Sequence, residues 1–216
     1  MFLSIPHPPE ISGNGGFGMR EKLIQEDKAV SVIDFYPGKW EGEGLRYAYS
    51  LRFPDRPLFR QEADCIVNGR SPGGDWDYMG LLLPGEYGAG AVVSARCAFE
   101  GDGAPMLLLS MENGEDGDGC LLTLEYYEIV IWKNGLNVWR HYTENGTTSH
   151  YLALGASFPL EAGKIHTLTG EFREKRMLLS VGGMKFNLYV PDLTKRFTLG
   201  YTACEGLCRL YGLEVR

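Results

Sequence analysis

One stretch of the sequence holds a glutamate, two histidines and two tryptophans, namely Glu128, Trp132, Trp139, His141 and His150. A carboxylate beside a histidine couples two titrations and can orient the ring as an acid or a base near neutral pH. Flat tryptophan rings can stack on the apolar C–H faces of a sugar, while polar side chains bind its hydroxyls. These residue types therefore indicate either a saccharide-binding surface or an acid–base site.

The pair Asn134-Gly135 determines whether these side chains can meet. Asn-Gly favours a two-residue hairpin turn, because both central positions need positive φ. If Asn134-Gly135 is such a turn, Lys133 pairs with Leu136, and Glu128 then lies opposite His141. The other face of this hairpin is mostly apolar and is predicted to face a core; it carries Tyr127, Ile129, Ile131, Val138, Arg140 and Tyr142.

A second turn around Asn145-Gly146 extends the hairpin to three strands. It pairs His141 with His150 and Trp139 with Leu152. Because alternate strand residues share a face, the polar and aromatic residues of the three strands gather on one side. That face is predicted to carry Tyr126, Glu128, Trp132, Asn137, Trp139, His141 and His150.

Several interpretations of this face are open. In a binding protein, Tyr126, Trp132, Asn137, Trp139 and His150 would contact an oligosaccharide or glycoside. In an enzyme, Glu128 and His141 would be the catalytic acid–base pair of a hydrolase, lyase or epimerase. The same residues are also compatible with ordinary packing and a surface ion pair, or with a metal site of two histidines and one carboxylate.

Two other groups of charged residues are candidates. Glu62-x-Asp64 is predicted to place two carboxylates on one face of a strand over 61–67, as glycoside hydrolysis requires, with Arg96 as a ligand contact or a partner of these acids. Asp116 and Asp118 lie in an acidic loop with oxygen ligands at a calcium-like spacing, although the full calcium-loop pattern is incomplete. A solvated hairpin tip is the alternative, and no cofactor is expected unless this loop binds calcium.

The elements that position these residues are predicted to be β-strands. The 216 residues include 29 glycines, about twice the average share. Short β-type runs alternate with turn signals, no long segment has a helical period, and no linker divides the chain. We therefore expect one antiparallel domain over 1–216, with 1–27 as an irregular N-terminal wrap. Gly182-Gly183 predicts a two-residue hairpin that places Leu179 and Phe186 on its core face.

Charge and cysteine content narrow the partners. The net charge of −7 opposes binding to nucleic acid or to an anionic membrane, whereas a neutral sugar is compatible with it. The first residues lack a basic and apolar leader, and no apolar run is long enough to span a bilayer. Five scattered cysteines favour reduced thiols. These features predict a cytoplasmic protein.

The second half of the chain resembles the concanavalin A-like lectin/glucanase superfamily. The stretches that carry the likeness are EYYEIVIWKNGLNVWRHY (125–142), RMLLSVGGMKFNLYV (176–190) and FTLGYTACEGLCRLYGLEVR (197–216). The resemblance implies an all-β jelly-roll sandwich of two curved sheets that binds or cleaves carbohydrate on its concave sheet. It also implies that Glu128, Trp132, Trp139 and His141 lie near that cleft.

One departure from the superfamily bears on activity. Its retaining glucanases carry three acids at alternate strand positions, but Glu62-x-Asp64 is followed by Cys65, Ile66 and Val67. The leading hypothesis is therefore an oligosaccharide-binding protein, with a glycoside-processing enzyme as the second. A third is an interaction module whose exposed aromatics pack on a partner or on another copy of the chain.

Overall fold

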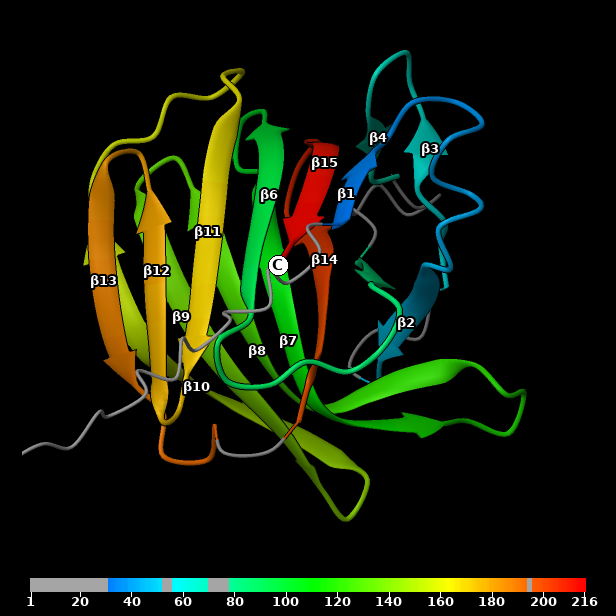
Figure 1. The fold of residues 1–216 in the computed structure, drawn as a ribbon, viewed down its shortest axis with the longest axis vertical. Helices are drawn as coiled ribbons and strands as arrows, with labels where there is room; N and C mark the ends of the chain where they lie inside the picture. The colour runs from blue at the N-terminus through cyan, green and yellow to red at the C-terminus, as the bar shows by residue number, and fades with distance from the viewer. Residues whose placement is uncertain (1–30, 52–55, 70–77, 194–195) are drawn as a thin grey trace, which may run out of the picture.

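The computed structural model describes residues 31–51, 56–69, 78–193 and 196–216, which form two β-sheets packed face to face (Figure 1). The predicted wrap over 1–27 lies outside the described residues. An eight-stranded sheet has the order β13 (Met184–Tyr189), β12 (Arg176–Val181), β11 (His166–Arg173), β6 (Val92–Phe99), β15 (Cys208–Val215), β4 (Ile66–Val67) and β3 (Arg60–Gln61), with β1 (Ser31–Asp34) paired to β15. A seven-stranded sheet contains β10 (Thr147–Ser157), β9 (Gly135–Glu144), β8 (Leu121–Trp132), β7 (Ala104–Glu115), β14 (Thr198–Cys204), β5 (Met79–Leu82) and β2 (Arg46–Ser50).

One hydrophobic core lies between the sheets. Leu107 and Ile129 of the seven-stranded sheet and Leu168 and Leu179 of the eight-stranded sheet belong to it and are almost fully buried. Alternate residues point inward because successive strand side chains face opposite sides of a sheet. The described residues contain no helix, and so none that could cross a membrane. The all-β sandwich predicted from the turn signals is confirmed.

The hairpin of β12 and β13 has the predicted register. Val181 pairs with Met184, and Leu179 pairs with Phe186. Gly182 and Gly183 have φ values of 57° and 79°, which glycine adopts without strain. The local sequence was sufficient here because a two-residue turn fixes every later pair.

The hairpin of β8 and β9 differs from its predicted register by two residues. Trp132 pairs with Gly135, so the turn consists of Lys133-Asn134. Gly135 lies within β9, where a Cβ atom would overlap the backbone carbonyl oxygen of Ala156 on β10. A shift of two residues preserves the faces of both strands, because the side-chain period is two. The predicted faces are therefore correct although the predicted pairs are wrong.

The hairpin of β9 and β10 is confirmed. Asn145 and Gly146 occupy the turn with positive φ values of 52° and 75°. His141 pairs with His150 and Trp139 pairs with Leu152, as predicted.

The strand predicted over 61–67 is wrong. Gln61 ends β3, Ile66 begins β4, and the residues between them form the turn of a short hairpin. Glu62 and Asp64 are exposed on this turn and do not share a strand face.

The seven-stranded sheet closes on itself at one end. The start of β8 pairs in parallel with β2 through Tyr49↔Leu122 and Ser50↔Thr123. Strands β8, β7, β14, β5 and β2 therefore form a continuous circuit of paired strands. In Figure 1 the hairpin of β7 and β8 extends sideways past β2.

Candidate functional site

A cleft of about 520 Å³ lies on the face of the seven-stranded sheet that points away from the shared core. It is lined by residues from β7, β8, β9, β10 and β14 and from neighbouring turns. These residues are Tyr78, Asp102, Ala104, Met106, Glu128, Val130, Trp132, Asn137, Trp139, His141, His150, Cys204 and Glu205. Pockets for small ligands commonly have about 300–1,000 Å³, so the volume suits a ligand of that size.

Glu128 and His141 meet within this cleft. The paired residue of Glu128 is Trp139, and His141 pairs with Tyr126, so the contact is diagonal across the two strands. Nε2 of His141 lies 2.9 Å from Oε2 of Glu128. Only 7 % of Glu128 and 2 % of His141 are exposed. The predicted carboxylate–imidazole pair therefore forms, and it is buried.

Tyr78 holds the other side of the carboxyl group. Its hydroxyl donates a hydrogen bond to Oε1 of Glu128. Burial, followed by the nearby Glu128 carboxylate, raises the pKa of Tyr78 well above its usual range. Tyr78 thus remains a neutral donor wherever the folded protein is studied near neutral pH.

Stacking fixes the plane of the His141 ring. The rings of Tyr126 and His141 are 4.5 Å apart and inclined by 3°. His150 stacks on the other side at 5.5 Å. In this orientation neither ring nitrogen of His141 makes an aligned hydrogen bond within the described part of the chain, although Nε2 is close to Glu128. The ring therefore presents buried polar atoms in a fixed position.

Two half-buried tryptophans, Trp132 and Trp139, line the cleft. Trp139 contacts His150 edge-on, with ring centroids 5.7 Å apart. Trp132 has a buried Nε1 without a hydrogen-bond partner among the described residues. Such a donor is costly to leave unpaired, so it is a natural contact for a ligand oxygen. Asn137, between the two tryptophans in sequence, also lines the cleft.

The mouth of the cleft carries two carboxylates that the sequence did not identify, Asp102 and Glu205. The carboxylate of Asp102 forms an ion pair with Lys133, whose Nζ lies 2.6 Å from Oδ1. Glu205 has a φ of 65°, a conformation uncommon for residues other than glycine. A Cβ atom at Gly206 would lie 2.5 Å from the backbone nitrogen of Gly103, so the two turns pack backbone against backbone.

Asn68 fixes the turn that carries Glu205. Its buried side chain donates to the carbonyl oxygen of Gly206 and accepts from the backbone nitrogen of Cys208, each at 2.8 Å. Glycines beside Asp102 and Glu205 are turn signals in the sequence. They gave no sign that the turns meet, because the contact joins residues about a hundred positions apart.

The structure brings most of the predicted residues together. Glu128, Trp132, Asn137, Trp139, His141 and His150 all line the cleft. Tyr126 does not, and its assignment as a ligand contact is corrected: it is fully buried, with its hydroxyl 3.0 Å from Oγ of Ser50. Tyr126 instead stacks against the His141 ring and holds it in place.

Glu62, Asp64 and Arg96 lie elsewhere. Glu62 pairs with Arg209 of the eight-stranded sheet at 3.3 Å. Arg96 is exposed on β6 and faces Asp34 at 3.9 Å, so it pairs with neither predicted acid. These residues belong to the other sheet because the β3–β4 hairpin joins β15.

The acidic loop is occupied by the protein's own groups. Arg56 forms an ion pair with Oδ2 of Asp116, whose Oδ1 accepts from the backbone nitrogens of Asp118 and Cys120, both at 2.9 Å. Asp118 is largely exposed. No group of three or more metal-binding side chains occurs within the described residues, so the described part offers no built cation site.

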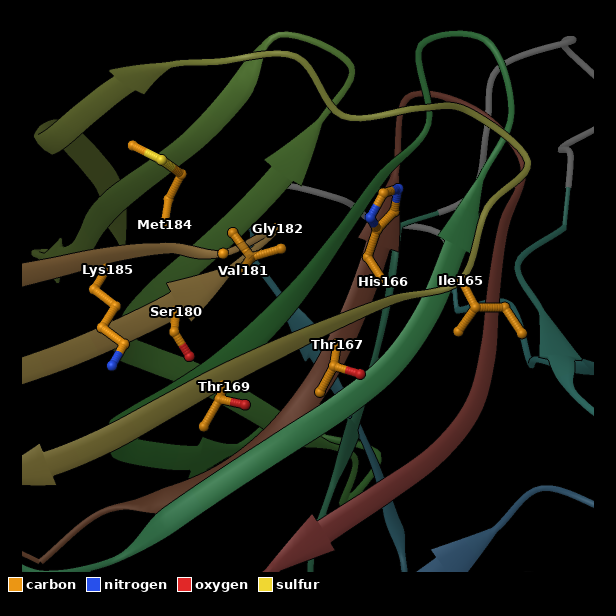
Figure 2. A pocket seen from close by; sticks show the side chains of 10 residues that line it. Ile165, His166, Thr167, Thr169, Ser180, Val181, Gly182, Met184 and Lys185 are labelled. Atoms are coloured by element: carbon orange, nitrogen blue, oxygen red, sulfur yellow. The ribbon is translucent and has the colours of Figure 1, made fainter.

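A second hollow of about 420 Å³ lies on the eight-stranded sheet, over β11, β12 and β13. Figure 2 shows its hydroxyl groups, Thr167, Thr169 and Ser180, with the ammonium group of Lys185 nearby. His166 at its edge already has a partner, because Nε2 lies 2.9 Å from the carbonyl oxygen of Glu161.

The fold is that of the concanavalin A-like jelly rolls. The chain is similar to a Bacillus subtilis protein of unknown function with a galectin-like fold, at 10% identity and a TM-score of 0.61, over 86% of this chain and 94% of that one. It is also similar to a Bacteroides ovatus mixed-linkage glucan GH16 protein in complex with a G4G4G3G product (11% identity, TM-score 0.53, 88% and 96%). β-Agarase A from Zobellia galactanivorans matches at 6% identity and a TM-score of 0.54, over 74% of each chain.

These TM-scores show a shared fold, and at such low identities they show the fold alone. No protein-family model matches the sequence, and no curated protein matches it.

Proposed function

We propose that the cleft binds a neutral oligosaccharide or glycoside. The observation that carries this proposal is the set of two half-buried tryptophans beside a buried, polar and rigidly stacked histidine. Trp132 and Trp139 offer apolar faces for sugar rings, while Nε1 of Trp132 and Nδ1 of His141 lack hydrogen-bond partners among the described residues and can bond to sugar hydroxyls.

The charge of the cleft favours an uncharged ligand. Its described lining contains the carboxylates Asp102, Glu128 and Glu205 and contains neither lysine nor arginine. The ammonium group of Lys133 is already paired with Asp102 at the mouth. A uronic acid or sulfated sugar would place like charges together in a poorly solvated site. Proteins that share the fold include a β-agarase and a GH16 protein holding a glucan product, which supports a saccharide ligand.

Isothermal titration against a panel of neutral and acidic oligosaccharides tests this proposal. We expect a neutral member to bind and Trp139→Ala to weaken its binding by at least about tenfold, or 1.4 kcal/mol. Tyr189→Ala is the matched control, because this aromatic residue is 63% exposed on β13. Absence of binding by every neutral member, or equal affinities for wild type and Trp139→Ala, would contradict the proposal.

A second candidate function is acid–base catalysis on the bound glycoside. The observation that favours it is the burial of Glu128 between the Tyr78 hydroxyl and the His141 ring. A buried carboxyl group with a histidine partner can exchange a proton with a glycosidic oxygen at the wall of the cleft. Glu128→Gln keeps the shape of the side chain and removes its acidic proton. Release of reducing sugar ends should stop in this variant while binding persists; release at the wild-type rate would exclude Glu128 from the chemistry.

The remaining expectations stay predictions. They are a cytoplasmic location, the absence of a bound cofactor, and self-association through exposed apolar residues. Tyr151 and Leu152 on the edge strand β10 are about half exposed and are the residues to replace in a test of self-association by analytical ultracentrifugation.

A further inference from the structure

The circuit of five paired strands closes one end of the cleft. Strand β2 would leave an unpaired edge beyond β5, but the start of β8 pairs with it. Two side-chain hydrogen bonds reinforce this closure. Oγ1 of Thr123 donates to the carbonyl oxygen of Tyr49 at 3.2 Å, and Oγ of Ser50 lies 3.0 Å from the hydroxyl of Tyr126.

Inside the circuit, a cluster of buried side chains fills the space beyond Glu128. Ala48, Leu82, Leu108 and Tyr126 form a separate buried cluster, each at most 3% exposed. A Cβ atom at Gly80 would lie 2.8 Å from the carbonyl oxygen of Ala48, so β2 and β5 approach as closely as glycine allows. A ligand that reaches Glu128 therefore meets packed side chains and cannot continue in this direction.

At the opposite end, the described residues leave the cleft open. Cys204 pairs with Ala104 at the mouth, and Leu108 pairs with Glu128 at the closed end. These two residue pairs lie four residues apart along β7, or about 13 Å at roughly 3.3 Å per residue. Asp102 at the mouth has a side chain that is 72% exposed. Along the strand direction, the described part of the cleft is therefore a passage closed at one end and open at the other.

We propose that this passage receives the terminus of a neutral saccharide chain, with the terminal sugar beside Glu128, Tyr78 and His141 and the following sugar against Trp132. The inference rests on the proposed function and adds the direction of binding to it. The interior of a chain lying along the strands would need an exit at both ends, and the cluster around Tyr126 removes one of them.

The test compares chain length and chain ends. The probes are neutral β-glucan and agarose oligosaccharides from the disaccharide upward, each in three forms: free, capped at the reducing end, and capped at the non-reducing end. We expect affinity to stop rising once the chain fills the passage. We also expect a cap on one end alone to weaken binding by at least about tenfold, while the cap on the other end has no effect.

Three outcomes are distinguishable. A plateau with sensitivity to a single cap supports recognition of a terminus. Affinity that rises steadily with length, insensitivity to both caps, and several protein molecules on one polysaccharide chain would overturn the inference while leaving saccharide binding intact. Failure of every oligosaccharide to bind would overturn the proposed function itself.

A variant provides a second measurement. Val130 lines the passage between Trp132 and Glu128, so Val130→Phe narrows the way to the closed end. We expect at least about tenfold weaker binding, with the unfolding transition monitored by circular dichroism as a check of folding. Val32→Phe, at a 58% exposed position on β1, is the control. A folded Val130→Phe protein that binds as tightly as wild type would overturn the placement of the terminal sugar.

Discussion

Two hollows of similar volume lie on the two sheets, yet their chemistry differs. The cleft on the seven-stranded sheet, about 520 Å³, has a buried glutamate and a buried histidine in its wall. The hollow on the eight-stranded sheet, about 420 Å³, has hydroxyl groups and the exposed Lys185 (Figure 2). Volume alone does not separate them.

The histidines show the difference most directly. His166 stacks on Phe99 and bonds to a backbone carbonyl, so its polar atom is satisfied by the fold. His141 is held by ring stacking and by its pair with Glu128, and its Nδ1 has no hydrogen-bond partner among the described residues. Buried polar atoms are normally satisfied, so an unsatisfied one in a cleft indicates a function rather than a structural role.

The largest predicted effect concerns the glycines that shape the two sheets. Gly135→Ala should lower the free energy of unfolding by about 3 kcal/mol, because its φ is 140° and a Cβ atom would overlap the carbonyl oxygen of Ala156. Gly183→Ala should cost only about 1 kcal/mol, since the residue has positive φ but open space around it. Urea denaturation of both variants measures the contrast. Equal costs would show that β9 and β10 separate easily and that the cleft wall is not rigid.

The second prediction concerns Tyr78. Tyr78→Phe removes the donor to the buried Glu128 carboxyl and should destabilise the protein by about 2 kcal/mol at neutral pH. Tyr189→Phe, at an exposed position of the eight-stranded sheet, should change the stability little.

The pH dependence of the free energy of unfolding gives a further test of Tyr78. The pKa of Tyr78 is raised by burial, whereas an unfolded tyrosine has a pKa of about 10. Below pH 10 both states keep the proton, and stability is unaffected by this group. Above pH 10 the unfolded state releases the proton first, so stability falls by up to about 1.4 kcal/mol per pH unit. Tyr78→Phe should show a shallower fall than wild type in alkaline denaturation; parallel curves would contradict the buried position of the hydroxyl.

Local sequence was enough to predict one wall of the cleft. Asn145-Gly146 fixed the pairing of β9 with β10, and the hydrophobic alternation fixed the faces of β8 and β9. The two-residue error at Asn134-Gly135 was harmless because strand faces repeat every two residues. This register error arose because β10 pairs so closely with β9 that only glycine fits at position 135, which therefore lies within the strand and not in the turn.

Contacts between distant segments could not be predicted in the same way. Tyr78, Asp102 and Glu205 enter the cleft from three separate parts of the chain. Tyr126 has the correct alternation for a ligand contact, but the parallel pairing of β2 with β8 buries it. Periodicity determines which face a residue occupies, while the closure of the sheet determines which part of that face remains open.

The smallest predicted effect compares two asparagines, one on each sheet. Asn137 is half-buried in the cleft, where its amide can donate to and accept from sugar hydroxyls; Asn187 is exposed on β13 at the edge of the other sheet. Asn137→Ala should weaken binding of the tightest neutral oligosaccharide by about fivefold, or about 1 kcal/mol, the usual net value of one hydrogen bond. Asn187→Ala should leave the dissociation constant unchanged in the same titration. Equal weakening by both substitutions, or weakening by Asn187→Ala alone, would contradict binding of the oligosaccharide in the cleft of the seven-stranded sheet.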